Sequence, residues 1–75
     1  MIHLIYRFCI NNKIALIKNI NSDIIKKIHL FIDDNDDLEK LNEINSHKIV
    51  IISVKKNPDY NDFFNYVLDK IPNEI

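Results

Sequence analysis

Residues 48–55 carry the strongest structural signal in the chain and read KIVIISVK. Isoleucine and valine favour strands, because their branched side chains fit a pleated surface. The run is apolar at odd and at even positions, which is typical of a strand covered on both faces of a sheet. It therefore predicts a central strand with the other elements assembled around it.

A helix is expected on each side of this strand. In residues 36–44, Leu38, Leu41 and Ile44 recur every three residues, and aspartates at the front favour the helix dipole. The segment therefore predicts a helix that precedes the strand.

The helix after the strand has clear start signals. Asn57 is predicted as its N-cap and Pro58 as its first helical residue. Its apolar face includes Phe64, which is expected in the core, whereas Tyr66 falls outside that face.

Residues 28–32, IHLFI, allow two interpretations. The helix-start signal at residues 21–23 could lead into a helix that continues through Ile32. Alternatively, a short helical turn is followed by a strand. Residues 28–31, IHLF, resemble residues 2–5, IHLI, and this similarity favours the strand.

The first twenty residues predict a β-hairpin. Apolar side chains alternate through residues 2–10, residues 11–13 supply an Asn-Asn-Lys turn, and residues 14–20 form the second strand. A three-residue loop opposes Phe8 to Leu16 and keeps nearly all apolar partners on one face. A two-residue loop would oppose Phe8 to Ala15 instead.

These elements predict an α/β fold of the α+β type. We expect residues 1–75 to form a small single two-layer domain, with an N-terminal β-hairpin followed by a βαβα unit. The sheet is expected to be mixed and four-stranded, with two to three helices mainly on one face. The strand–helix–strand portion should cross over right-handedly and pair its strands in parallel.

Composition excludes several classes of site. The chain contains no glycine, so phosphate-cradling loops, dinucleotide turns and nucleophile elbows cannot occur in their usual form. The single cysteine cannot form an internal disulfide, which indicates a reducing compartment and predicts a cytoplasmic protein. No stretch approaches 18 uninterrupted apolar residues, so no membrane association is expected.

Charge is distributed unevenly along the chain. Residues 1–32 hold five cations against one acid, and residues 33–45 hold six acids against one lysine. Such polarity suits electrostatic steering toward a charged partner. The predicted partner-binding residues are Asp33, Asp34, Asp36, Asp37, Glu39, Glu43 and Tyr66.

The acidic run has two other interpretations. It could be a solvated helix start stabilised by the helix dipole, or an oxygen-rich site for Mg²⁺ or Ca²⁺. It lacks the glycine and terminal glutamate of an EF-hand loop, and we expect neither a metal nor a cofactor.

Cysteine chemistry is a further alternative. Cys9 could act as a nucleophile with His3, His29 or His47 as base, or join them in a zinc site. His3 lies six residues away along the same predicted strand, about 20 Å at ~3.3 Å per residue, and no spacing resembles a ligand set. We expect a structural cysteine and no catalytic residues.

The sequence therefore favours a small non-enzymatic module that binds a larger protein. Sixteen isoleucines and eleven asparagines indicate an AT-rich genome. Chains of this size and bias suggest a phage or mobile-element inhibitor of a host or defence enzyme, of anti-CRISPR, antitoxin or immunity type, acting in the host-cell cytoplasm. Self-association is left open.

The alternative is a small nucleic-acid-binding protein with a lysine-rich face. Tyr6 and Tyr66 would serve it as stacking platforms. Its lysines would be Lys13, Lys18, Lys26, Lys27, Lys48, Lys55 and Lys56. A continuous basic face containing Lys18, Lys26 and Lys55 would favour this alternative, whereas an acidic helix beside an exposed aromatic patch would favour a protein partner.

Overall fold

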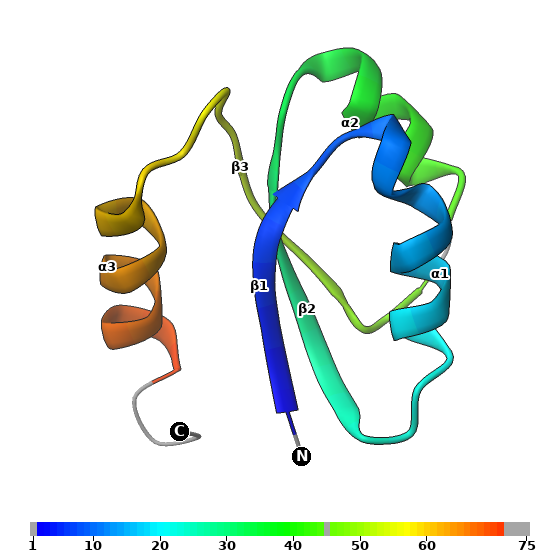
Figure 1. The fold of residues 1–75 in the computed structure, drawn as a ribbon, viewed down its shortest axis with the longest axis horizontal. Helices are drawn as coiled ribbons and strands as arrows, with labels where there is room; N and C mark the ends of the chain where they lie inside the picture. The colour runs from blue at the N-terminus through cyan, green and yellow to red at the C-terminus, as the bar shows by residue number, and fades with distance from the viewer. Residues whose placement is uncertain (1, 45, 72–75) are drawn as a thin grey trace.

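The structure is a computed structural model that describes residues 2–44 and 46–71. Its elements are β1 (Ile2–Phe8), the 3₁₀ turn η1 (Ile10–Asn12), α1 (Lys13–Ile20), β2 (Ile25–Ile32), α2 (Asn35–Asn42), β3 (Ile49–Val54) and α3 (Tyr60–Lys70). The strands form one parallel sheet in the order β1-β2-β3 (Figure 1). The predicted mixed, four-stranded sheet with an N-terminal hairpin is wrong.

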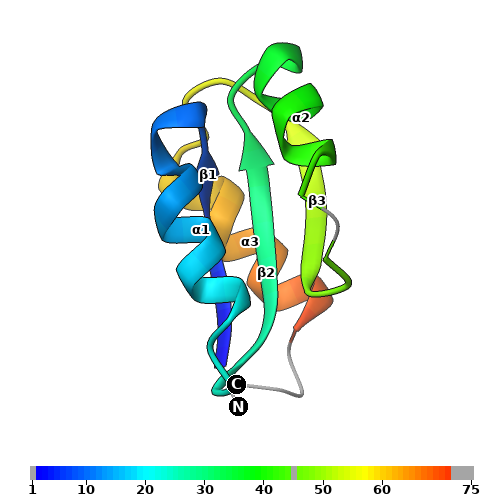
Figure 2. The ribbon, with the colours of Figure 1, turned by 90° about the vertical axis from the view of Figure 1, so that its right-hand side faces the viewer.

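The helices lie on both faces of the sheet rather than mainly on one. Helices α1 and α2 cover one face and α3 covers the other, as both views show (Figures 1 and 2). The crossovers β1-α1-β2 and β2-α2-β3 advance in the same direction across the sheet, so the right-handed rule places α1 and α2 on the same side. The arrangement is therefore three layers instead of the predicted two.

The hairpin prediction failed because residues 14–20 form a helix. Their apolar positions fit alternation, but they also fit a helix that buries Leu16 and half-buries Ile20, one turn apart. In α1 the side chain of Ile14 is 73% exposed, whereas a hairpin would have placed it on the same face as Leu16. A crossover helix lets β1 pair in parallel with β2, a long-range pairing that local periodicity does not reveal.

The strand interpretation of residues 28–32 is confirmed, and the strand begins earlier, at Ile25. It is β2, in the middle of the sheet, with its last five residues buried. β3 is a strand as predicted, but it lies at the edge and none of its residues is buried. Its apolar character on both faces therefore does not reflect a central position.

The start of α3 also differs from the prediction. Asp59, not Asn57, is the N-cap, and it forms a capping box with Asp62. Asn57 instead takes a positive φ of 53°, which asparagine tolerates better than most residues. Pro58 precedes the cap and so does not open the helix.

The main core lies between the sheet and the α1/α2 layer. It contains Phe8, Leu16, Ile25, Ile28, Leu30, Ile32 and Leu41. On the opposite face Phe31 and Ile71 are buried, and the Phe31 and Phe63 rings meet edge to face at 5.1 Å. Phe64, expected in the core, is 49% exposed on the outer side of α3.

None of the helices among the described residues is long and apolar enough to span a bilayer. At this chain length only roughly 60% of the unfolded surface is buried on folding, so stability depends on few contacts. Helix α3 has no buried residue between Tyr60 and Lys70, as is also the case for β3.

Candidate functional site

The carboxyl ends of the three parallel strands gather most of the acidic residues. Asp33, Asp34 and Asp37 follow β2, and one oxygen from each lies within 4.8 Å of the others. Asp34 caps α2, because its Oδ1 accepts a 2.9 Å hydrogen bond from the backbone N–H of Asp37. The three carboxylates have the donor chemistry to hold a hard cation, although one of them already serves the helix start.

Arg7 links this end of the sheet together. Its Nε lies 3.8 Å from Oδ1 of Asp33, and its Nη1 donates a 3.1 Å hydrogen bond to Oδ1 of Asn57. Oδ1 of Asp33 is buried and accepts no hydrogen bond from the described residues. Arg7 thus supplies the positive charge beside the buried oxygen and ties β1 to the loop before α3.

The seven predicted partner-binding residues do not form one surface. Asp37 is buried, contrary to the exposure expected for the acidic helix, and Asp33 is half-buried. Tyr66 lies in α3, across the sheet from α2 (Figure 1). The acidic residues left exposed around α2 are Asp34, Asp36, Glu39 and Glu43.

The opposite face of the sheet carries a row of polar rings that sequence reasoning missed. Nδ1 of His3 lies 2.9 Å from Nε2 of His29, and Nδ1 of His29 lies 2.6 Å from the Tyr66 hydroxyl. The row joins β1, β2 and α3. With His29 neutral, one consistent arrangement has Tyr66 donating to Nδ1 of His29 while Nε2–H of His29 donates to His3.

Burial shifts the pKa values of two side chains in this row. His29 is only 6% exposed, and its burial lowers its pKa below the ordinary value of 6.5, with the charges of His3 and Lys27 adding to the effect. Burial raises the pKa of the Tyr66 hydroxyl, an effect that Lys70 partly offsets. Burial therefore favours the neutral forms of His29 and Tyr66 near pH 7, and the contact between them ties α3 to the sheet.

A signal for this row was present in the sequence. His3 and His29 occupy equivalent places in the repeated Ile-His-Leu pattern, which suggested similar strands but not their register. In the structure Ile5, not His3, pairs with His29, so the two histidines share a face two residues out of register. Once parallel pairing is known, the common face follows from the period-two alternation.

Cys9 follows the carboxyl end of β1 and is half-buried. His3 lies near the other end of the same strand, and neither it nor His29 or His47 joins Cys9 in a metal-ligating group within residues 2–44 and 46–71. The structure therefore does not bring together the residues of the nucleophile or zinc alternatives.

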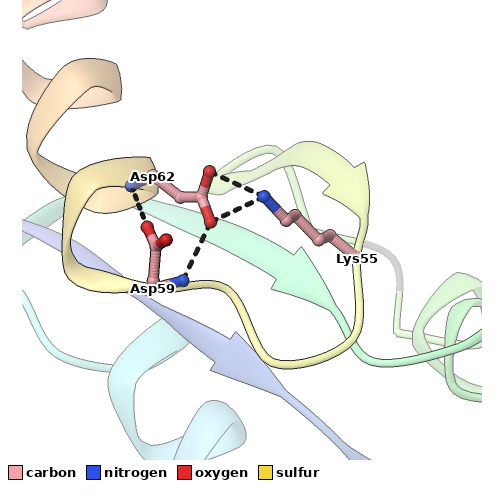
Figure 3. A network of polar contacts seen from close by, with 3 residues as sticks. All are labelled: Lys55, Asp59 and Asp62. Atoms are coloured by element: carbon pink, nitrogen blue, oxygen red, sulfur yellow. Dashed lines mark hydrogen bonds and ion pairs between the residues drawn. The ribbon is translucent and has the colours of Figure 1, made fainter.

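Figure 3 shows how Lys55 is engaged at the start of α3. Its Nζ lies 2.8 Å from Oδ1 and 2.7 Å from Oδ2 of Asp62. Asp62 in turn exchanges hydrogen bonds of 2.8 and 2.9 Å with Asp59 in the capping box. These contacts raise the pKa of Lys55 and lower that of Asp62, and they fasten the end of β3 to α3.

The lysines proposed for nucleic-acid binding are scattered. Lys26 lies at the amino end of β2, whereas the backbone N–H of Lys55 bonds to Ile32 at the carboxyl end. Lys26 and Ile32 are six residues apart along the strand, which corresponds to roughly 20 Å. Lys27 and Lys48 donate to the backbone oxygens of His47 and Ser22 at 2.9 and 2.8 Å.

An exposed apolar surface runs along α3. Tyr60, Phe64 and Leu68 recur at every fourth residue and are 79%, 49% and 58% exposed. The rings of Tyr60 and Phe64 stack at 6.1 Å with an interplanar angle of 15°. We call these three side chains the α3 ridge.

A second candidate surface, of mixed apolar and polar lining, lies at β3. Beside this strand, a cavity of about 200 Å³ is lined by Leu41, Asn42, Ile44, Ser46, Ile49 and Ile51. It lies between the end of α2 and β3.

Comparison with protein-family models, curated proteins and solved structures found no match for this chain.

Proposed function

We propose that this chain is a non-enzymatic protein-binding module that docks through the α3 ridge. The observation that carries the proposal is the alignment of Tyr60, Phe64 and Leu68 on the outer side of a helix. Water-exposed apolar side chains at this spacing match the way a helix inserts its anchors into an apolar groove of a partner. Covering them removes apolar area from water, which favours association by about 25 cal/mol per Å² buried.

The electrostatics support a protein partner over a nucleic acid. The lysines expected to form a basic face lie at both ends of the sheet, and three of them are engaged by acceptors within the chain. Binding to phosphate needs cations clustered along one surface. The exposed acids around α2 would instead repel a nucleic acid, while they would steer a basic protein surface toward the module.

The narrower proposal is an inhibitor encoded by a phage or mobile element that acts on a host or defence enzyme in the host-cell cytoplasm. It rests on size, composition and the single cysteine. An occupied apolar ridge suits such a role, because a small domain can block a larger protein only by covering part of its surface.

The test is affinity capture from an extract of the native host, with and without nuclease. The wild-type chain is compared with Phe64→Lys on the α3 ridge and with the matched control Ile14→Lys, which changes an exposed isoleucine on α1. Thermal unfolding of each variant establishes that it is folded. We expect the wild type and the control to retain the same nuclease-resistant partner and Phe64→Lys to lose it.

Two outcomes contradict the proposal. Loss of all captured proteins after nuclease treatment would assign the chain to nucleic-acid binding. Retention of the partner by folded Phe64→Lys would exclude the α3 ridge as the docking surface.

A further inference from the structure

β3 presents an unpaired strand edge. Among residues 2–44 and 46–71 it bonds to β2 on one side only, and Figure 2 shows none of their helices or strands beyond its other side. All six residues, Ile49–Val54, are uncharged, and none is buried. An exposed apolar edge of this kind is a template for pairing with another strand, because its outward N–H and C=O groups lack partners in a sheet.

The cavity beside β3 gives such a strand a place for a side chain. Four of its six lining residues are apolar: Leu41 and Ile44 from the α2 side, and Ile49 and Ile51 from β3. α2 has eight residues and is therefore about 12 Å long, which is too short to cover the length of β3. A dry cavity of ~150 Å³ accommodates a benzene molecule, so a cavity of about 200 Å³ has room for a leucine or phenylalanine side chain.

The lysines that flank β3 favour one kind of pairing strand over another. Lys48 precedes the strand, and Lys55 and Lys56 follow it. Asp62 neutralises Lys55, so Lys48 and Lys56 leave a positive charge at each end. Antiparallel pairing of two copies would bring Lys48 of each copy toward Lys56 of the other, and like charges at opposed positions are destabilising. A strand with acidic residues at its ends meets attraction instead.

We propose that β3 takes up an extended segment of a partner protein as a fourth strand, with an apolar side chain in the cavity beside Ile49 and Ile51 and acidic residues flanking the apolar core of the segment. The proposal rests on the protein-binding function proposed above and names a second contact with the partner. Main-chain hydrogen bonds supply affinity in this mode, and the cavity and the lysines supply specificity.

The probe is a library of random twelve-residue peptides displayed on phage and selected on the wild-type chain. We expect the enriched peptides to alternate apolar and polar residues over five to six positions, with Asp or Glu on both flanks. A selected synthetic peptide should bind Ile51→Lys at least about tenfold more weakly, equivalent to about 1.4 kcal/mol. Ile14→Lys, an identical change at an exposed isoleucine on α1, should bind like the wild type.

A second variant guards against misfolding of Ile51→Lys. Lys56 is exposed in the loop after β3, so Lys56→Glu should leave the fold intact. It should weaken the acidic peptide, and the difference from the wild type should shrink as salt rises. Hydrogen exchange of the complex should show new protection of the amides in residues 49–54.

Several results would overturn the inference. The selection could enrich no peptides, or it could enrich peptides that lack the alternation or the acidic flanks. A selected peptide could also bind folded Ile51→Lys as tightly as it binds the wild type. Peptides that bind the wild type but fail on Phe64→Lys alone would leave the protein-binding function standing and refute the β3 site. A wild-type dimer in sedimentation that Ile51→Lys dissociates would show that a second copy occupies the edge.

Discussion

His29 connects three elements of this small domain. It is nearly buried in the middle strand, and its ring nitrogens contact His3 in β1 and Tyr66 in α3. Burying an imidazole ring without hydrogen-bond partners would cost free energy. The contacts with His3 and Tyr66 give both ring nitrogens of His29 a partner and so allow a histidine at this buried position. Tyr66, predicted as a solvent-facing contact for a partner, therefore has an internal role.

We predict that Tyr66→Phe destabilises the chain by about 1–3 kcal/mol, because it leaves Nδ1 of buried His29 without the 2.6 Å contact. Tyr60→Phe is the matched control, since Tyr60 is highly exposed and its stack on Phe64 does not need the hydroxyl. Urea unfolding of both variants measures the difference. Equal stabilities of the two variants would refute the structural role of the row.

We also predict that the free energy of unfolding falls as the pH drops below about 7. The unfolded chain takes up a proton on His29 near pH 6.5, whereas the folded chain, with its lowered pKa, takes it up only at lower pH. Between the two pKa values the unfolded state binds more protons, so acid removes stability. The charged and titratable groups that act on His29 are His3 on β1, Lys27 on β2 and Tyr66 on α3, and Lys70 acts on Tyr66.

Urea titrations at several pH values from about 7 to 5 check this prediction. His29→Gln, which cannot take up the proton, should show a flatter decline over that window. A decline of the same slope in a folded His29→Gln variant would assign the effect to other groups.

At the scale of elements, the sequence predicted a helix or strand correctly wherever the pattern was unambiguous. The strand at residues 49–54 and the helices α2 and α3 lie close to their predicted places, whereas residues 28–32, which allowed a helix or a strand, form the last part of β2. The prediction of a strand at residues 14–20 was wrong because their short apolar pattern fits the period of a strand and that of a helix. Which one forms depends on whether β1 pairs with the adjacent segment or with β2. The edge position of β3 was equally hidden, since strand order is a property of long-range pairing.

A pair of substitutions separates the helix from the hairpin at residues 14–20. Leu16→Ala should cost about 2–5 kcal/mol, because it empties a fully buried site, whereas Ile14→Ala should change stability by less than about 0.5 kcal/mol. In the hairpin both side chains would face the core and both changes would be costly. Comparable losses for the two variants in chemical denaturation would contradict α1.

At the scale of the whole molecule, the structure is thin, with principal extents of 31 × 28 × 16 Å. Within the described part of the chain, a three-stranded sheet with helices on both faces leaves both edge strands and the outer side of α3 uncovered. The hypothesis of a binding module came from the absence of glycine-dependent sites and the uneven charge distribution, and it stays a prediction. The sequence could not locate the α3 ridge, because Phe64 was assigned to the core, and burial depends on which side of α3 meets the sheet.

The measurement that tests protein binding most directly is hydrogen exchange of the chain alone and with its captured partner. The amides of α3 lie under few buried side chains and should exchange readily in the free chain. We predict that the partner slows exchange across Tyr60–Lys70, where the α3 ridge would be covered. Unchanged exchange in α3, with protection confined to the acidic residues 34–43, would contradict the account.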